Sequence, residues 1–320
     1  MLDLTFLSEE QVFDDNQLDI FKEKVDIFGD NQLYTVQNNQ RECIITDFTS
    51  LLGVVYQDTG SIFGDWWTKS PNEDDNITTV DVGGNSDYSF ADVYDIGIRP
   101  AFVYSSIKSD FSNKVREVSG IKEIEYGEYP QWAVDEENSL RLEELYNDGK
   151  IRETGKKYTT YFSDIDYEED EDGKTVFSER THIEYEYDGK KYIRFVGDVN
   201  SEDGYLKDGR EIEDGKIYWI SVEPIVWLVD EKNDIALSKY IIVSGIQFDD
   251  KDIYKGDFEN TVIKRFMDTY LAKEIECSLA DKLIENKSYD FDRIFEDAIK
   301  KMNEINNQEK SKELTKKITI

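Results

Sequence analysis

Every proline and every tryptophan of this 320-residue chain falls within one of four short motifs. Proline fixes φ and cannot donate to a sheet ladder, and tryptophan brings a large ring that usually packs in a core. A chain with four prolines and five tryptophans, all confined in this way, is predicted to use the motifs for specific turns and packing. The motifs are Trp66-Trp67-Thr-Lys-Ser-Pro71, Gly97-Ile-Arg-Pro-Ala-Phe102, Tyr126-Gly-Glu-Tyr-Pro-Gln-Trp132 and Tyr218-Trp219-Ile-Ser-Val-Glu-Pro-Ile-Val-Trp227.

Local signals predict several helices. Ser8 and Gln11 form a capping-box signature, and apolar spacing at Leu18, Phe21 and Val25 continues the expected helix until Gly29. Thr46 is an expected N-cap of a second helix. A short helix around residues 140–146 is expected to end at Gly149, because glycine favours the left-handed conformation at a helix end. From residue 260 onward, apolar residues at three- and four-residue spacing predict further helices.

Strand signals dominate the middle of the chain. The alternating segment 184–187, the Asp-Gly pair and the segment 190–195 together predict a tight hairpin. A second pair, 217–229 and 235–243, is rich in Ile, Val, Tyr and Trp and is expected to lie centrally in a sheet. Residues 60–105 read as loop-rich β-structure. The expected fold class is therefore α+β with antiparallel strands.

The charge is large and uneven. The chain has 71 acidic and 38 basic residues, a formal net charge of −33. Residues 1–250 carry 56 acidic and 24 basic residues, whereas residues 251–320 carry 15 and 14. Binding to nucleic acid requires Lys and Arg to replace counterions, and anionic membrane surfaces repel such a protein. We therefore expect neither direct nucleic-acid binding nor membrane association.

Composition also bears on location and chemistry. The first residues lack the basic start and apolar run of a signal peptide, and no stretch approaches the roughly 18 apolar residues of a membrane-spanning helix. Cys43 and Cys277 are expected to be free thiols, so a cytoplasmic location is predicted. The only histidine, His182, is expected at the surface of a strand. No zinc, P-loop or dinucleotide motif occurs, and no catalytic residue, metal or cofactor is predicted.

The four motifs resemble those of a group of uncharacterised proteins from Firmicutes and their phages. That group has an LSxEE-like start and WWLRSP-, GVRPA-, YGxYPQ- and VEPIxWLVDE-type segments. The matching residues here are 7–10, 66–71, 97–102, 126–132 and 222–231. The likeness extends over most of residues 4–275, with Thr68-Lys69 in place of the usual Leu-Arg. It implies a phage- or mobile-element-related protein in a bacterial host cell and carries no established activity.

The first two motifs also resemble the end of C-type-lectin-like domains, including those of formylglycine-generating enzymes and phage receptor-binding proteins. In those folds the arginine of the second motif is packed inside the domain. The resemblance implies that Arg99 is structural and pairs with a buried carboxylate. Structural roles are likewise expected for Pro100, Pro130 and Pro224.

A polar segment after the tryptophan pair is the leading contact surface, and it lies within an interface expected over residues 68–95. Residues 70–76 combine Pro, Asn and carboxylates, which calcium-dependent lectins use in a sugar-bridging loop. The Trp-Asn-Asp partner strand of those lectins is missing, so a long polar loop is preferred, with calcium or sugar binding left open. The contact candidates are Trp66, Trp67, Lys69, Asn72, Glu73, Asp74, Asp75 and Asn76.

A second acidic segment follows about ninety residues later. An EF-hand loop needs Gly at position six and Glu at position twelve, and neither Asp164 nor Asp166 starts such a frame. A solvated acidic loop is therefore the preferred interpretation. The residues of this acidic patch are Asp164, Asp166, Glu168, Glu169, Asp170, Glu171 and Asp172.

Together these observations predict a C-type-lectin-like module over residues 1–105 and an antiparallel β-rich module over 120–258, which either stands apart or shares one sheet with the first. A helical C-terminal extension is expected over 259–320.

The predicted function is non-enzymatic binding, with polar loops contacting a glycan or a protein that has a basic surface. Two alternatives remain: an acidic nucleic-acid mimic that occupies the basic groove of a host defence protein such as a CRISPR-type nuclease, and a virion structural component. The oligomeric state is left open.

Overall fold

The structure is a computed structural model, and its described residues fall in one compact unit, Met1–Cys277. Glu73, Cys277, the acidic patch 164–172 and the helices expected after residue 278 lie outside the described residues. Those described are 2–14, 17–22, 24–28, 32–36, 40–53, 62–72, 74–107, 115–118, 120–163, 177–197, 204–249 and 254–276.

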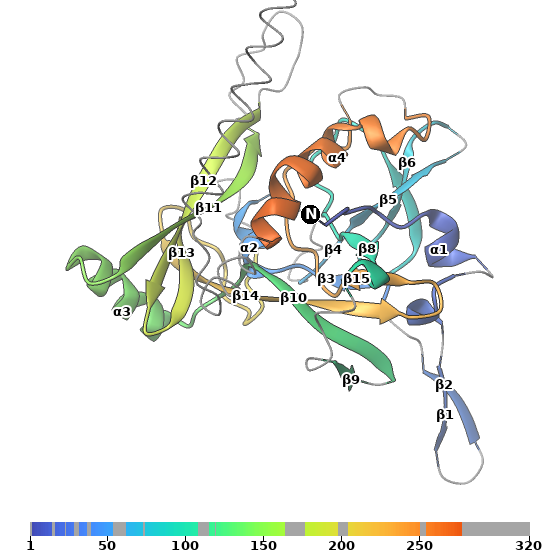
Figure 1. Cartoon of the computed structure of the whole chain (residues 1–320), viewed down its shortest axis with the longest axis horizontal. Coiled ribbons are helices and arrows are strands. Elements are labelled where there is room, and N and C mark those ends of the chain that lie inside the picture. The colour runs from blue at the N-terminus through green and yellow to red at the C-terminus, as the bar shows by residue number, and fades with distance from the viewer. Residues whose placement is uncertain are drawn as a thin grey trace, which may run out of the picture. The chain divides into compact units, whose positions relative to one another are not determined.

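The largest sheet is antiparallel and is organised around one long strand, β14 (Ile217–Asp230) (Figure 1). Along one side β14 pairs with β10 (Ile121–Ala133). Along the other side it pairs first with β13 (Lys190–Val196) and then with β15 (Ile235–Ser238). The sequence prediction of a central strand pair is confirmed, because β14 and β15 are each hydrogen-bonded on both sides, but the second strand ends at Ser238 and not at residue 243.

Four more strands complete this sheet in the described part of the chain. They are β8 (Ala101–Val103) next to β15, β9 (Arg116–Val118) next to β10, and β12 (Phe177–Tyr187) and β11 (Arg152–Ser163) beyond β13. The β12–β13 hairpin turns at Asp188 and Gly189, which have φ of 52° and 71°. This is the tight turn that the Asp-Gly pair predicts. β8 brings a segment from before residue 105 into the same sheet as the later strands.

Three smaller sheets accompany the large one among the described residues. The three-stranded sheet contains two of the tryptophans and is followed by the second motif. The small sheets are β1 (Lys24–Phe28) with β2 (Gln32–Val36), β3 (Cys43–Ile44) with β4 (Phe63–Gly64), and β5 (Trp66–Pro71) with β6 (Ile77–Val80) and β7 (Ser86–Ser89).

The N-terminal capping box is confirmed, but the helix that follows it is short. In α1 (Glu9–Phe13) the Ser8 hydroxyl accepts from the Gln11 N–H, and the Gln11 side chain accepts from the Ser8 N–H. The expected continuation to Val25 is wrong, because a short 3₁₀ turn and then β1 replace it. A distant carboxylate competes for this backbone: Asp230 Oδ2 accepts from the Asp19 N–H at 2.6 Å.

The other predicted helices form where their local signals lie. Thr46 caps α2 (Asp47–Leu51), and α3 (Glu136–Asn147) ends before Gly149, whose φ is +67°. In Figure 1, α3 lies beside β13. Arg194 of β13 is joined to Glu143 of α3 at 2.9 Å.

The last described helix contains a wider turn. α4 (Val262–Phe266) passes into a π-helical turn, η6 (Met267–Leu271), and returns to α-helix over residues 272–276. π-turns inside helices are rare and are frequent at functional sites.

One core cluster joins segments that are far apart in the sequence. It includes Leu7, Trp66 and Val80 from the first quarter of the chain and Leu228 and Ile241 from the last third. Antiparallel strands and two helical segments are thus combined around shared cores, which confirms the α+β class.

Candidate functional site

The tryptophan pair belongs to the core and not to a contact surface. Trp66 and Trp67 are both 0% exposed. Trp66 Nε1 donates to the Arg41 carbonyl at 2.9 Å, and its ring stacks against Phe21. The Trp67 ring packs against Phe248 with 5.2 Å between centroids. The expectation that these indoles contact a partner is corrected, because apolar side chains from distant segments cover both of them.

Arg99 is buried and structural, but its partners differ from the expected carboxylate. It is 1% exposed, and its guanidinium donates to the carbonyl oxygens of Ser238 at 2.9 Å and Gln40 at 2.7 Å. The guanidinium carbon also lies 4.8 Å from the centroid of the Trp66 ring, a cation–π arrangement. No carboxylate in the described residues forms an ion pair with it. Burial lowers the pKa of Arg99 from its ordinary value.

The prolines lie at sheet positions where a missing N–H is tolerated. The Pro100 carbonyl accepts from the Ser238 N–H at 2.8 Å. Pro130 lies opposite Val222 at an irregularity in β10, and Pro224 lies opposite Glu128 in β14. Proline within a sheet is confined to such bulges and to ladder-free positions.

Hydrogen bonds between the Asn72 side chain and the backbone of the same loop hold the β5–β6 loop in shape. Asn72 Oδ1 accepts from the N–H groups of Asp74 and Asn76, each at 2.9 Å. Asp75 has a φ of 61°, which asparagine and aspartate tolerate in tight turns. Asn76 is buried and Lys69 is half-buried, whereas the side chains of Asp74 and Asp75 are exposed. Of the described loop candidates, these two carboxylates are therefore the ones best placed to meet a partner.

The adjoining strand β7 and the segment directly after it add two exposed rings. Tyr88 and Phe90 are 58% and 57% exposed. Among the described strands, β7 pairs with β6 only and is the edge of its sheet. We define the acidic-aromatic surface as the exposed residues Asp74, Asp75, Asp87, Tyr88, Phe90 and Asp92. Sequence reasoning places the interface in residues 68–95 but does not single out these rings, because their exposure depends on which segments cover them in the fold.

Carboxylates crowd this part of the molecule. Residues 70–98 contain seven acidic residues and no Lys or Arg. Burial, reinforced by the nearby charges of Asp81 and Asp87, raises the pKa of Asp65 to about 7. A cation brought to this surface would offset that repulsion.

His182 is buried, so the prediction of a surface histidine is wrong. It is 5% exposed, its Nε2 lies 2.8 Å from the Thr160 hydroxyl, and its ring stacks on Phe195. Burial, with a contribution from the charge of Arg180, lowers the pKa of His182 to about 3. A histidine that stays neutral inside an aromatic layer is a core residue here, and its neighbours come from three different strands or helices.

A polar cluster lies where the last helix meets β10 and β11. Glu274 Oε1 accepts from the Thr159 N–H at 2.7 Å, while Glu274 Oε2 and the Tyr129 hydroxyl are buried without a hydrogen-bond partner in the described residues. Burial raises the pKa of Glu274 to about 7. Burial and the nearby charge of Glu274 raise the pKa of Tyr129 well above its ordinary value.

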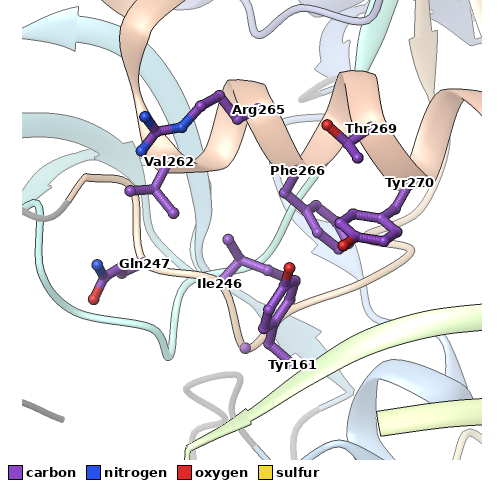
Figure 2. A pocket seen from close by; sticks show the side chains of 9 residues that line it. Tyr161, Ile246, Gln247, Val262, Arg265, Phe266, Thr269 and Tyr270 are labelled. Atoms are coloured by element: carbon purple, nitrogen blue, oxygen red, sulfur yellow. The ribbon is translucent and has the colours of Figure 1, made fainter. Parts of the chain in front are cut away.

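A pocket of about 300 Å³ opens between the last helix, β11 and the segment 245–247 (Figure 2). Sequence reasoning misses it, because Tyr161 lies more than eighty positions before the other wall residues, which fall within 245–270 and show no common motif. The lining residues are Tyr161, Gly245, Ile246, Gln247, Val262, Arg265, Phe266, Thr269 and Tyr270.

The described residues contain neither a metal-site arrangement nor a membrane-spanning helix. No group of three or more His, Cys, Asp or Glu side chains there is arranged to hold a metal ion. No helix in that part of the chain is long and apolar enough to cross a membrane.

Comparison of the whole chain with protein-family models, with curated proteins and with solved structures found no match.

Proposed function

We propose that this chain is a non-enzymatic binding protein that presents the acidic-aromatic surface to a protein partner with a basic surface. The observation that carries the proposal is the pair of exposed rings among carboxylates, with Tyr88 on the edge strand β7 and Phe90 directly after it. Aromatic side chains are enriched among the anchors of protein interfaces. Large apolar rings that are more than half exposed mark a surface that a partner can cover.

Charge supplies the specificity in this proposal. The segment 70–98 contains carboxylates and no cation, so a basic surface is attracted and an acidic one is repelled. The surrounding net charge of −33 adds long-range steering, which raises association rates and falls with salt. The long polar loops on β5–β7 are also the feature that supports a C-type-lectin-like module, and we keep that assignment, a cytoplasmic location and a phage-related origin as parts of the proposal.

The test is affinity capture from bacterial lysate with the full chain as bait. Tyr88→Ala/Phe90→Ala should lose the captured basic protein, and raising NaCl from about 0.1 to 0.5 M should weaken capture by the unaltered chain. The matched control is Leu140→Ala, which removes a 64% exposed apolar side chain from α3 and should leave capture unchanged. Equal capture by the double variant and the unaltered chain would overturn the proposal.

The same experiment separates the alternatives. Nucleic-acid mimicry requires that DNA competes for the captured protein, because the two ligands then occupy one basic groove. A partner displaced by DNA that still binds Tyr88→Ala/Phe90→Ala would support mimicry and refute the acidic-aromatic surface. Concentration-dependent assembly of the purified chain in light scattering, without any captured protein, would instead support a virion component.

A further inference from the structure

We propose that the pocket beside the last helix binds a small molecule that joins a planar ring to an anionic group. The pocket is formed by three segments: β11, which lies far back in the sequence, residues 245–247, and the helix of α4 and η6. Its volume of about 300 Å³ lies at the low end of the range for ligand pockets, which is about 300–1,000 Å³. It is separate from the acidic-aromatic surface, with which it shares no residue.

Aromatic rings form one wall. Val262, Phe266 and Tyr270 follow at four-residue steps on the helix, and Figure 2 shows the rings of Phe266 and Tyr270 next to each other, with Tyr161 across from them. The Tyr161 ring meets Phe266 and Tyr270 edge-on, with centroids 5.7 and 6.1 Å apart. Such a wall offers both ring faces and edges to a planar ligand.

Contacts behind the rings hold this wall in place. Glu179 Oε1 accepts from the Tyr270 hydroxyl at 2.6 Å and from the Tyr161 hydroxyl at 3.4 Å. The carboxylate thus joins β12 to η6 and fixes both rings. Pre-formed walls reduce the entropy lost when a ligand binds. The π-turn η6 lies in the same wall, in agreement with the frequent use of such turns at binding sites.

Arg265 supplies the charge. Its side chain is exposed, and it forms no ion pair with any carboxylate in the described residues, although acidic residues outnumber basic ones 71 to 38. By contrast, Arg152, Arg194 and Arg210 each pair with a carboxylate. A cation left without a carboxylate at an aromatic pocket is available to an anionic ligand.

Two polar groups accompany this cation. The Gln247 side-chain amide and the Thr269 hydroxyl line the pocket, and neither forms a hydrogen bond within the part of the chain that the structure describes. The pocket therefore combines one aromatic wall with three side-chain donors, from Arg265, Gln247 and Thr269. A few polar groups in an apolar pocket fix the orientation of a ligand, and donors select a carboxylate, sulfonate or phosphate over a neutral group.

The test compares two probes of the same shape, 2-naphthoate and the neutral 2-naphthamide, by titration calorimetry on the full chain. We expect naphthoate to bind several-fold more tightly. Arg265→Met should abolish this preference and leave naphthamide binding unchanged. Arg141→Met, which removes an exposed arginine from α3, should preserve the preference and controls for the change in net charge.

Clear results would overturn the proposal. These are no binding of either probe at 1 mM (roughly the weakest affinity that calorimetry follows), equal affinity for the two probes, or the same preference in Arg265→Met as in the unaltered chain. Tyr161→Leu should weaken both probes about tenfold, and its circular dichroism checks that the chain is folded. Tyr88→Ala/Phe90→Ala should bind both probes normally, so failure here and failure of the proposed function are distinguishable.

Discussion

Arg99 joins three distant parts of the chain at one buried point. Its guanidinium reaches the carbonyls of Gln40 and Ser238 and the face of Trp66. Backbone carbonyls and an aromatic face can receive a buried guanidinium because its five N–H groups spread the charge over a plane. Removing the arginine would leave the Gln40 and Ser238 carbonyls without this hydrogen-bond donor. Its loss would therefore affect the packing of those two segments as well as that of residue 99.

We expect Arg99→Met to lower the free energy of unfolding by about 2–4 kcal/mol, because the two carbonyls keep their burial and lose their donors. Urea unfolding followed by tryptophan fluorescence measures this change. Arg141→Met, an exposed arginine with no ion pair among the described residues, should change stability by less than about 0.5 kcal/mol. A variant Arg99→Met as stable as the unaltered chain would show that water or repacking replaces the arginine.

Glu274 makes stability depend on pH near neutrality. Its pKa of about 7 lies above the ordinary value of a glutamate, so the folded chain holds the proton more tightly than the unfolded chain does. The corresponding stability is complete at pH values below about 4.5, decreases as the pH rises, and is lost once the pH passes about 7. Glutamine at this position is always neutral and keeps the oxygen that accepts from the Thr159 N–H.

We therefore expect Glu274→Gln to gain stability relative to the unaltered chain by about 2 kcal/mol between pH 5 and pH 8. Urea unfolding of both proteins at the two pH values gives the difference, in which the opposite contribution of the buried His182 cancels. Glu136→Gln on the exposed face of α3 is the control and should show no such pH dependence. A constant difference between the proteins at both pH values would contradict the assignment.

Sequence reasoning identified some of these residues and not others. Arg99 was found because its motif resembles one with an internal arginine, but its acceptors were not, since Gln40 and Ser238 are up to 139 positions away. The sequence predicts a surface position for His182, because the rings that cover it, Phe48 and Phe195, are far away in the chain and contact it only in the fold. Nothing in the sequence near Glu274 distinguishes it from an exposed helical glutamate, because its burial comes from packing against β11 in the fold.

At the scale of elements, β10 and the last helix approach each other at a glycine. A Cβ added to Gly127 would lie 2.2 Å from Ile275 Cγ2 and 3.0 Å from the Ile275 carbonyl oxygen. Gly127 also has a φ of +66°, at an irregularity between Glu125 and Glu128 in the β10 ladder. The bulge in the Tyr-Gly-Glu-Tyr-Pro motif thus has a packing role, because it lets the helix rest directly on the strand.

Two glycine substitutions distinguish the cost of a clash with the last helix from the cost of placing alanine in a left-handed backbone conformation. Gly149 has a φ of +67° and no atom within 4 Å of its added Cβ, so Gly149→Ala should cost only about 1 kcal/mol for the left-handed conformation. Gly127→Ala should cost about 2–4 kcal/mol, since the helix must also move away. Thermal unfolding of both variants measures the difference. Equal losses would mean that the helix does not press on the strand.

The elements that could be predicted from the sequence are those whose signals lie within a few residues, such as helix caps and tight turns. The capping residues at Ser8 and Thr46 and the Asp188-Gly189 turn act within four residues of themselves, and their elements begin where expected, although the helix after Ser8 is shorter than expected. The hairpin β1–β2 replaced an expected helix because strand pairing and the bond from Asp19 to Asp230 outweigh apolar spacing. The π-turn has no local signature in this sequence.

At the scale of the whole molecule, the net charge of −33 opposes folding. Bringing like charges together costs free energy that the extended chain avoids. Screening shortens the reach of this repulsion, from a Debye length of about 14 Å at 0.05 M salt to about 4 Å at 0.5 M.

We expect the free energy of unfolding to rise by about 1–2 kcal/mol when NaCl is increased from about 0.05 to 0.5 M. Urea titrations at several salt concentrations measure the trend, and KCl should give the same curve because screening does not depend on the cation. A fall in stability with NaCl would show that ion pairs such as Glu123 with Lys239 contribute more than the repulsion does.

The core cluster that joins Leu7, Trp66 and Val80 to Leu228 and Ile241 cannot be completed until most of the chain has been synthesised. A ribosome that adds about 5–20 residues per second takes roughly 10–30 s to extend the chain from Val80 to Ile241. During that interval the first apolar side chains are outside the ribosome without the strands that cover them. We therefore expect chaperones that bind exposed apolar segments to associate with the nascent chain, and we expect repulsion between carboxylates to keep unfinished copies apart.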